Sequence, residues 1–163
     1  MQKQAYQDEL TSVKNVAAYD KKVYDLNQKI SAGQAAFAVV MVDLNQLKEV
    51  NDRFGHEKGN IALQTLCQAV CRLYKHSPVY RIGGDEFVVI LEGEDYDNRD
   101  ALFQKVQAFE RIRDLKAAQP WTQLAASVGM AVYDKTCDAT YQAVFNRADA
   151  RMYEQKQHLA PRT

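Results

Sequence analysis

The sequence has no excess of charge of either sign. Its 21 basic and 21 acidic side chains cancel, so no global field favours binding to a nucleic-acid backbone or to an anionic membrane. Long apolar runs are missing too, because the longest, residues 35–42, is far shorter than a membrane span. No apolar stretch of a secretory signal follows the first residues. We therefore expect a cytoplasmic domain that makes no direct contact with nucleic acid or membrane.

Cysteine is scarce and odd in number. Cys67, Cys71 and Cys137 do not have the spacing of paired metal ligands, although the first two lie four residues apart on a predicted helix. Reduced thiols packed in the core are favoured over a metal site. The length of 163 residues fits one domain with a sizeable core.

Apolar periodicity predicts a sheet packed against helices. Helices are expected at about 13–30, 46–53, from 59–60 onward, 101–118 and 141–157. Residues 36–44 form a continuous apolar segment, which predicts a central strand covered on both faces, with Asp43 at its C-terminal end. A hairpin is expected over residues 78–91, a polar loop over 92–99 and another strand over 124–133.

Two glycines followed by two acids stand at the tip of the predicted hairpin. We expect Gly83 and Gly84 to adopt the positive φ angles of a tight turn, which would present Asp85 and Glu86 at an open edge. Adjacent carboxylates repel each other, and a divalent cation would relieve that repulsion. Taken alone, this pattern is more typical of a solvated turn, and the rest of the chain argues against that interpretation.

The run from Gly83 to Phe87 is identical to the signature of the GGDEF family, the diguanylate cyclase domains. Residues 8–15, 42–60 and 148–156 resemble three further motifs of that family, in the same order. The resemblance covers about residues 8–156 and implies an α+β fold. Its core would be a ferredoxin-like split βαβ unit, similar to adenylyl cyclase domains and polymerase palms, with a central mixed sheet flanked by helices.

The resemblance implies that two GTP molecules are condensed to cyclic di-GMP, with release of two pyrophosphates and with Mg²⁺ (or Mn²⁺ as a substitute). Asp43, the Leu44 carbonyl and Asp85 match the metal-binding positions of the family. Asp85 also matches the residue proposed to help deprotonate the attacking 3′-hydroxyl. Glu86 is expected to be a further metal ligand or an electrostatic support.

Substrate contacts are implied as well. Lys48 and the backbone of Gln46 and Leu47 match the segment that cradles the phosphates, where Lys48 would stabilise charge in the transition state. Gly83 and Gly84 would let the nucleotide approach the backbone. For Lys48 alone, an ordinary solvated lysine is the alternative.

Three positions carry implied contacts of different kinds. Lys156 matches a lysine that reaches the terminal phosphates, or it is only a cation favoured near a helix C-terminus. Asn51 matches a contact to guanine. Asn60 departs from the family, which usually has aspartate there; an amide offers guanine a single acceptor oxygen, so base selection would be less strict. Asn60 is also suited to cap the following helix.

Other departures concern contacts at the periphery. Asn45 replaces the second acid of the first motif. Ala160 stands where a phosphate-binding arginine is usual, and Arg162 is a possible substitute. Tyr74 and Ser77 replace the arginine and aspartate of the family's inhibitory motif, so we expect no product-inhibition site of that form.

The resemblance also implies how the domain is used. One domain would hold one GTP, so catalysis requires a homodimer. Residues 1–12 are expected to end a connecting helix from an upstream sensor domain, and residues 13–163 to form the GGDEF domain. Whether the full protein is anchored in a membrane is left open. Two alternatives remain open: a GTP-binding regulatory module, and a cyclase with relaxed purine choice.

Overall fold

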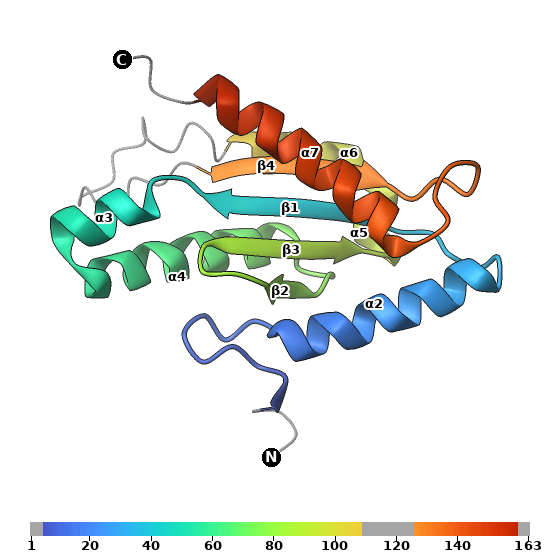
Figure 1. The fold of residues 1–163 in the computed structure, drawn as a ribbon, viewed down its shortest axis with the longest axis horizontal. Helices are drawn as coiled ribbons and strands as arrows, with labels where there is room; N and C mark the ends of the chain where they lie inside the picture. Colours follow the sequence, from blue (N-terminus) through green and yellow to red (C-terminus); the bar gives the residue numbers. More distant parts are fainter. Residues whose placement is uncertain (1–4, 109–125, 160–163) are drawn as a thin grey trace.

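The computed structural model describes residues 5–108 and 126–159 of the chain. In chain order (Figure 1) its elements are α2 (Val16–Ser31), β1 (Ala38–Leu44), α3 (Leu47–Phe54), α4 (His56–Leu73), β2 (Val79–Arg81), β3 (Glu86–Leu91), α5 (Gly93–Asp97), α6 (Arg99–Gln107), β4 (Ala126–Val132) and α7 (Tyr141–Leu159). Among the described residues, no helix is both long and apolar enough to cross a bilayer.

The four strands form one sheet in the order β2-β3-β1-β4. The crossover from β1 through α3 and α4 makes β1 and β2 parallel, but β3 lies between them. Every neighbouring pair of these strands is therefore antiparallel. The α+β class and the split βαβ order are confirmed, whereas the mixed sheet that we expected is wrong.

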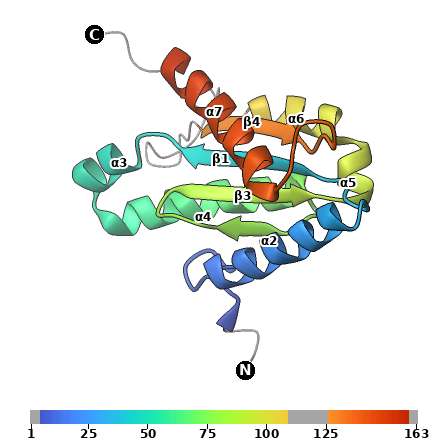
Figure 2. The same cartoon turned by 45° about the vertical axis from the view of Figure 1, so that its right-hand side comes forward.

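Helices cover both faces of the sheet, and β1 is buried along its whole length. Val40 and Val42 pack with α4 and α6, whereas Val39 and Met41 pack with α2 and α7. In Figures 1 and 2, α7 accordingly runs across one face of the sheet and α2 lies along its β2 side, while α4 and α6 lie behind the sheet. Because side chains alternate along a strand, Asp43 is directed to the same face as Val39 and Met41, the face covered by α7.

The acidic segment after β3 is helical, where a loop was expected. Gly93 has φ 63°, which lets the chain turn from β3 into α5. Asp95 is buried and accepts hydrogen bonds from the His76 backbone N–H (3.1 Å) and the Ser77 hydroxyl (2.6 Å). This buried carboxylate fixes α5 against the end of α4. Charge density alone suggested a solvated segment. Residues 109–118 of the helix predicted from residue 101 lie outside the described residues.

Residues 6–15 form a turn, where the end of a helix was expected. Asp8 accepts hydrogen bonds from the Thr11 backbone N–H (2.9 Å) and hydroxyl (2.6 Å). Lys14 then makes a parallel bridge to Tyr80, donating to the Val79 carbonyl at 3.0 Å and accepting from Arg81 N–H at 2.9 Å. The segment therefore covers the outer edge of β2.

The opposite edge of the sheet, β4, is covered by side chains of α7. Arg147 and Arg151 donate to the carbonyls of Val132 and Met130, both at 2.7 Å. Gln155, one turn further, accepts from the Val128 backbone N–H. Between these contacts the helix backbone lies directly on Gly129, where an added Cβ would come within 2.4 Å of Ala148 O and Met152 N. The absence of a side chain at 129 thus sets how closely α7 packs.

Candidate functional site

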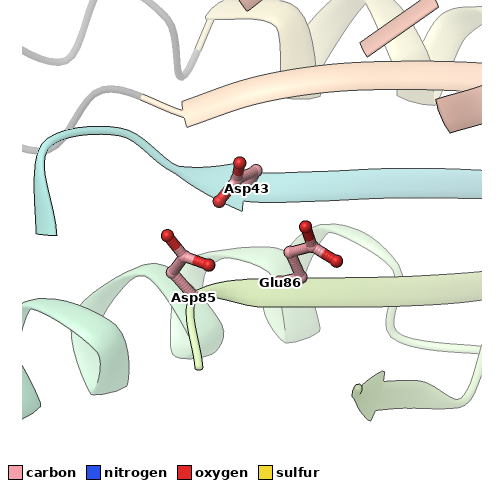
Figure 3. Close-up of side chains that lie close together, drawn as sticks. All are labelled: Asp43, Asp85 and Glu86. Atoms are coloured by element: carbon pink, nitrogen blue, oxygen red, sulfur yellow. The ribbon is translucent and has the colours of Figure 1, made fainter. Parts of the chain in front are cut away.

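Two carboxylates meet at the site because of strand register. Asp43 near the end of β1 pairs with Glu86 at the start of β3, and both face α7, since directly paired residues lie on the same face of a sheet. Asp85 lies in the turn just before β3, and its carbonyl accepts from Leu44 N–H at 3.0 Å. Oxygen atoms of Asp43, Asp85 and Glu86 lie within 4.8 Å of one another (Figure 3).

Asp43 is the buried member of this acidic cluster, with 3% of its surface exposed. Oδ2 accepts a hydrogen bond from Lys156 Nζ at 2.6 Å, whereas the buried Oδ1 has no partner among the described residues. Burial raises the pKa of Asp43 to about 6, helped by the charges of Asp85 and Glu86 and opposed by Lys156. A buried acceptor without a partner among the described residues thus belongs to the acidic cluster.

Glu86 shares this environment. Its pKa is raised by burial and by the charges of Asp85 and Asp149, against the effect of Lys156. The hydrogen bond to Asp43 raises the pKa of Lys156, so the ammonium stays charged. The cluster therefore carries more negative charge than the single lysine neutralises, which is the electrostatic condition for binding a hard divalent cation.

The hairpin turn is held by an arginine whose role the motif alone does not indicate. Arg81 donates to the carbonyls of Gly83 (3.3 Å) and Gly84 (2.8 Å) and pairs with Asp8 at 3.3 Å. Neither glycine has a positive φ, so that expectation is wrong. A Cβ added at Gly84 would meet nothing within 4 Å. The fold itself therefore does not require glycine at position 84.

The loop from β1 to α3 carries the expected phosphate-binding segment. Gln46 has a left-handed backbone with φ 64°, and no side chain caps the first turn of α3. Leu47 begins this helix and Lys48 is exposed beside it. The Asn45 side chain binds β4 instead of the acidic cluster, because its Oδ1 accepts a hydrogen bond from the Ser127 hydroxyl at 3.0 Å.

Asn51 and Asn60 lie at the junction of α3 and α4. The helix α4 begins at His56 after Gly55, whose φ is 92°, so Asn60 stands in its second turn and the helix-cap interpretation is wrong. The Asn60 side chain is exposed. Asn51 Oδ1 is buried without a partner among the described residues, and a Cβ at Gly59 would come within 1.7 Å of it. Gly59 therefore makes room for the Asn51 amide.

The described residues bring the predicted site together in two parts. One is an open cleft of about 610 Å³ beside α7, lined by Asp43, Glu86, Asn146, Asp149, Ala150, Met152, Tyr153 and Lys156. The other is the α3–α4 end, with Lys48, Asn51 and Asn60. The acidic cluster belongs to the strand ends and borders the first part. Ala160 and Arg162 lie outside the described residues. A cavity of about 630 Å³ near Tyr6 and Tyr74 lacks all these groups.

Fold and acidic cluster define an α+β domain with an oxygen-rich site of the kind that binds divalent cations. The family model described as the GGDEF domain of diguanylate cyclases matches residues 5–161. The chain therefore belongs to the GGDEF family.

Curated relatives support this assignment. The bifunctional diguanylate cyclase/cyclic di-GMP phosphodiesterase MucR of Pseudomonas aeruginosa is 29% identical over 154 residues, which are 93% of this chain and 22% of MucR. Diguanylate cyclase DgcP of Escherichia coli is 30% identical over 161 residues, 95% of this chain and 46% of DgcP. The chain thus spans less than half the length of either relative.

A solved structure shows the same fold. The coiled coil and GGDEF domain of DgcB from Caulobacter crescentus, in complex with c-di-GMP, aligns with a TM-score of 0.79. The alignment covers 96% of this chain and 83% of the DgcB chain, at 21% identity. At that identity the likeness concerns the fold alone.

Proposed function

We propose that this domain is a diguanylate cyclase that condenses two GTP molecules to cyclic di-GMP and releases two pyrophosphates. In each step a ribose 3′-oxygen forms a bond to an α-phosphorus, and the bond from that phosphorus to the pyrophosphate oxygen breaks. The observation that carries the proposal is the acidic cluster at the GGDEF turn, in which one buried oxygen of Asp43 has no partner in the described part of the chain. Membership of the family gives the reaction class.

Mg²⁺, with Mn²⁺ as a substitute, fits the residues present. Asp43, the Leu44 carbonyl, Asp85 and Glu86 would supply hard oxygen ligands. Burial and, to a smaller extent, repulsion between the carboxylates raise the pKa of Asp43 and of Glu86, and a divalent cation would relieve that repulsion. When bound, the metal would neutralise charge on the reacting phosphates and polarise the α-phosphate.

The remaining roles fall to the chain's own groups. Asp85 would accept the proton of the 3′-hydroxyl, and Glu86 would support the local charge. Lys48 and the backbone at Gln46 and Leu47 would hold phosphate oxygens. Arg81 keeps the turn carbonyls fixed.

Other contacts would orient the nucleotide at its two ends. Gly83 and Gly84 would leave the backbone open to the nucleotide, in keeping with the free space at Gly84. Asn51 and Asn60 would contact the base, and Lys156 the terminal phosphates. Because one domain would hold one GTP, two copies must meet to supply nucleophile and electrophile. We also propose that an upstream sensor domain controls this pairing, since the relatives are longer proteins.

Product chromatography after incubation of concentrated protein with Mg²⁺ and GTP tests the proposal. We expect cyclic di-GMP from the wild type, loss of product in Asp85→Asn, and unchanged product in the exposed control Asp97→Asn. GTP binding without product, also after artificial dimerisation, would instead identify a GTP-binding regulatory module.

A second candidate, a cyclase with relaxed purine choice, is favoured by Asn60. Its position inside α4 removes the helix-cap explanation, and its amide is exposed. A mixture of GTP and ATP should then yield a mixed cyclic dinucleotide. Asn60→Asp restores a charged acceptor and should raise selectivity for guanine about tenfold. Cyclic di-GMP as the only product from the mixture would contradict this candidate.

A further inference from the structure

The acidic cluster already contains a cation supplied by the chain itself. Lys156, near the end of α7, reaches Asp43 across 113 residues of sequence and places Nζ 2.6 Å from Oδ2. The Asp43 side chain is 4% exposed, whereas that of Lys156 is 46% exposed. The Lys156 ammonium therefore binds a buried acid, while its side chain remains partly exposed to water.

A lysine satisfies this cluster only in part. Its ammonium carries one charge at one point, while Asp43, Asp85 and Glu86 place oxygen atoms within 4.8 Å of one another. Asp43 is only 3% exposed, and its Oδ1 atom has no partner among the described residues. A divalent cation would bring twice the charge and several coordination positions to the same oxygens.

We propose that Lys156 is a displaceable internal cation, which occupies Asp43 when no metal is bound and leaves it when a divalent cation binds. The inference rests on the metal site of the proposed function and adds an autoinhibitory contact to it. Metal binding then has to compete with Lys156. The apparent affinity for the metal is the intrinsic affinity multiplied by the fraction of molecules in which Lys156 has left Asp43.

The consequence for the nucleotide is a coupling between two ligands. Once released, Lys156 is an exposed ammonium beside the cleft and is free to bind phosphate oxygens. A triphosphate that binds Lys156 removes the competitor of the metal, so each ligand strengthens the binding of the other. The movement is confined to the side chain, because Arg147, Arg151 and Gln155 hold α7 on β4.

Binding of Mn²⁺ alone, followed by the electron paramagnetic resonance signal of the free ion, tests the proposal without nucleotide or catalysis. Lys156→Met should bind Mn²⁺ about tenfold more tightly than the wild type. Lys105→Met removes one exposed positive charge on α6 and should leave the affinity unchanged, which separates competition from net charge. Equal affinity of Lys156→Met and the wild type, weaker binding, or no binding in either protein would overturn the proposal.

Thermal unfolding in EDTA gives a second readout. Lys156→Met should lower the midpoint of thermal unfolding, because Asp43 loses its partner. Replacing EDTA with saturating Mn²⁺ should restore the midpoint. In an Asp43→Asn background the same substitution should have a clearly smaller effect, whereas an equal decrease there would overturn the pairing. Lys156→Gln provides the same comparison if the methionine variant does not fold. An absence of product from GTP would refute the proposed function while leaving these binding results valid.

Discussion

Asp43 and Asp138 are both buried carboxylates paired with a basic residue of α7, yet they are completed to different degrees. Asp138, 5% exposed, accepts both arms of Arg147 at 2.8 Å and the Asp134 backbone N–H at 2.9 Å. Asp43, 3% exposed, has a single bond to Lys156 and one oxygen without a partner among the described residues. The two acids are therefore paired with basic residues that lie about two and a half turns apart on the same helix.

The pKa values move in opposite directions for this reason. The hydrogen bonds from Arg147 lower the pKa of Asp138 in spite of its burial, whereas burial raises the pKa of Asp43 to about 6. A structural carboxylate is satisfied within the chain. In the proposed metal site, by contrast, Asp43 would stay partly unsatisfied, at the expense of stability, until a cation binds.

Asp138→Asn should have the largest effect on stability. It breaks a bidentate ion pair and removes the charge that balances the Arg147 guanidinium, so we expect a loss of about 3 kcal/mol in the free energy of unfolding. Urea denaturation at pH 7 measures it, with the exposed Asp97→Asn as the control. Any activity should persist in the protein that remains folded. A loss no greater than that of the control would show that Asp138 is not structural.

Asp43→Asn should show the opposite pattern. We expect product formation and Mn²⁺ binding to fall about 100-fold, because a buried ligand loses its charge. Stability in EDTA at pH 7 should be equal or higher, since the repulsion from Asp85 and Glu86 is relieved. Calorimetric titration with Mn²⁺ and urea denaturation together check this. A large loss of stability would show that Asp43, like Asp138, has a structural role.

Lys156→Arg should reduce the difference between the two pairs. A guanidinium can donate to both oxygens of Asp43, as Arg147 does to Asp138. We expect a gain of about 1 kcal/mol in stability in EDTA and weaker Mn²⁺ binding. Denaturation and metal titration of the same preparation measure both. Stronger Mn²⁺ binding by the arginine variant would argue against the comparison.

The pH dependence of stability should separate the two acids with a smaller effect. Because the folded pKa of Asp43 is raised from 3.8 to about 6, the folded state binds the extra proton between these values, and wild-type stability falls as pH rises through that window. The advantage of Asp43→Asn in EDTA should therefore grow from about pH 4 to 6 and then stay constant.

Asp138 has the opposite sign. Its folded pKa lies below 3.8, so its contribution is present above about pH 4 and is lost as pH falls through the folded pKa. The deficit of Asp138→Asn should shrink only at such acid pH. Urea midpoints over a pH series in EDTA measure both profiles, and parallel profiles would contradict the assignment.

The sequence was sufficient to predict the position of the acidic cluster, because local strand and turn patterns determine it. Alternation along the apolar strand places Asp43 on a defined face, and the GGDEF signature locates Asp85 and Glu86 beside it. It was insufficient where long-range contacts decide. The Lys156–Asp43 pair joins residues 113 apart, and no local pattern contains it.

Local rules also failed at element boundaries. The preference of asparagine for helix N-caps suggested a start at Asn60, yet α4 begins at His56 through the positive φ of Gly55 without a side-chain cap. The acidic segment after β3 became α5 because Asp95 is buried by bonds to the α4–β2 connection. Such tertiary contacts override composition.

The contacts between α7 and β4 restrict how two copies can meet. Residues four apart on a helix rise by about 6 Å, close to the ~6.6 Å between every second residue of a strand. Arg147, Arg151 and Gln155 therefore stay in step with Val132, Met130 and Val128, and each bonds one backbone group of its strand residue. These bonds make the edge over residues 128–132 a poor template for extension of the sheet by a second chain. If two copies meet as we propose, their contact along this edge would be made by side-chain surfaces, and strand exchange there is disfavoured.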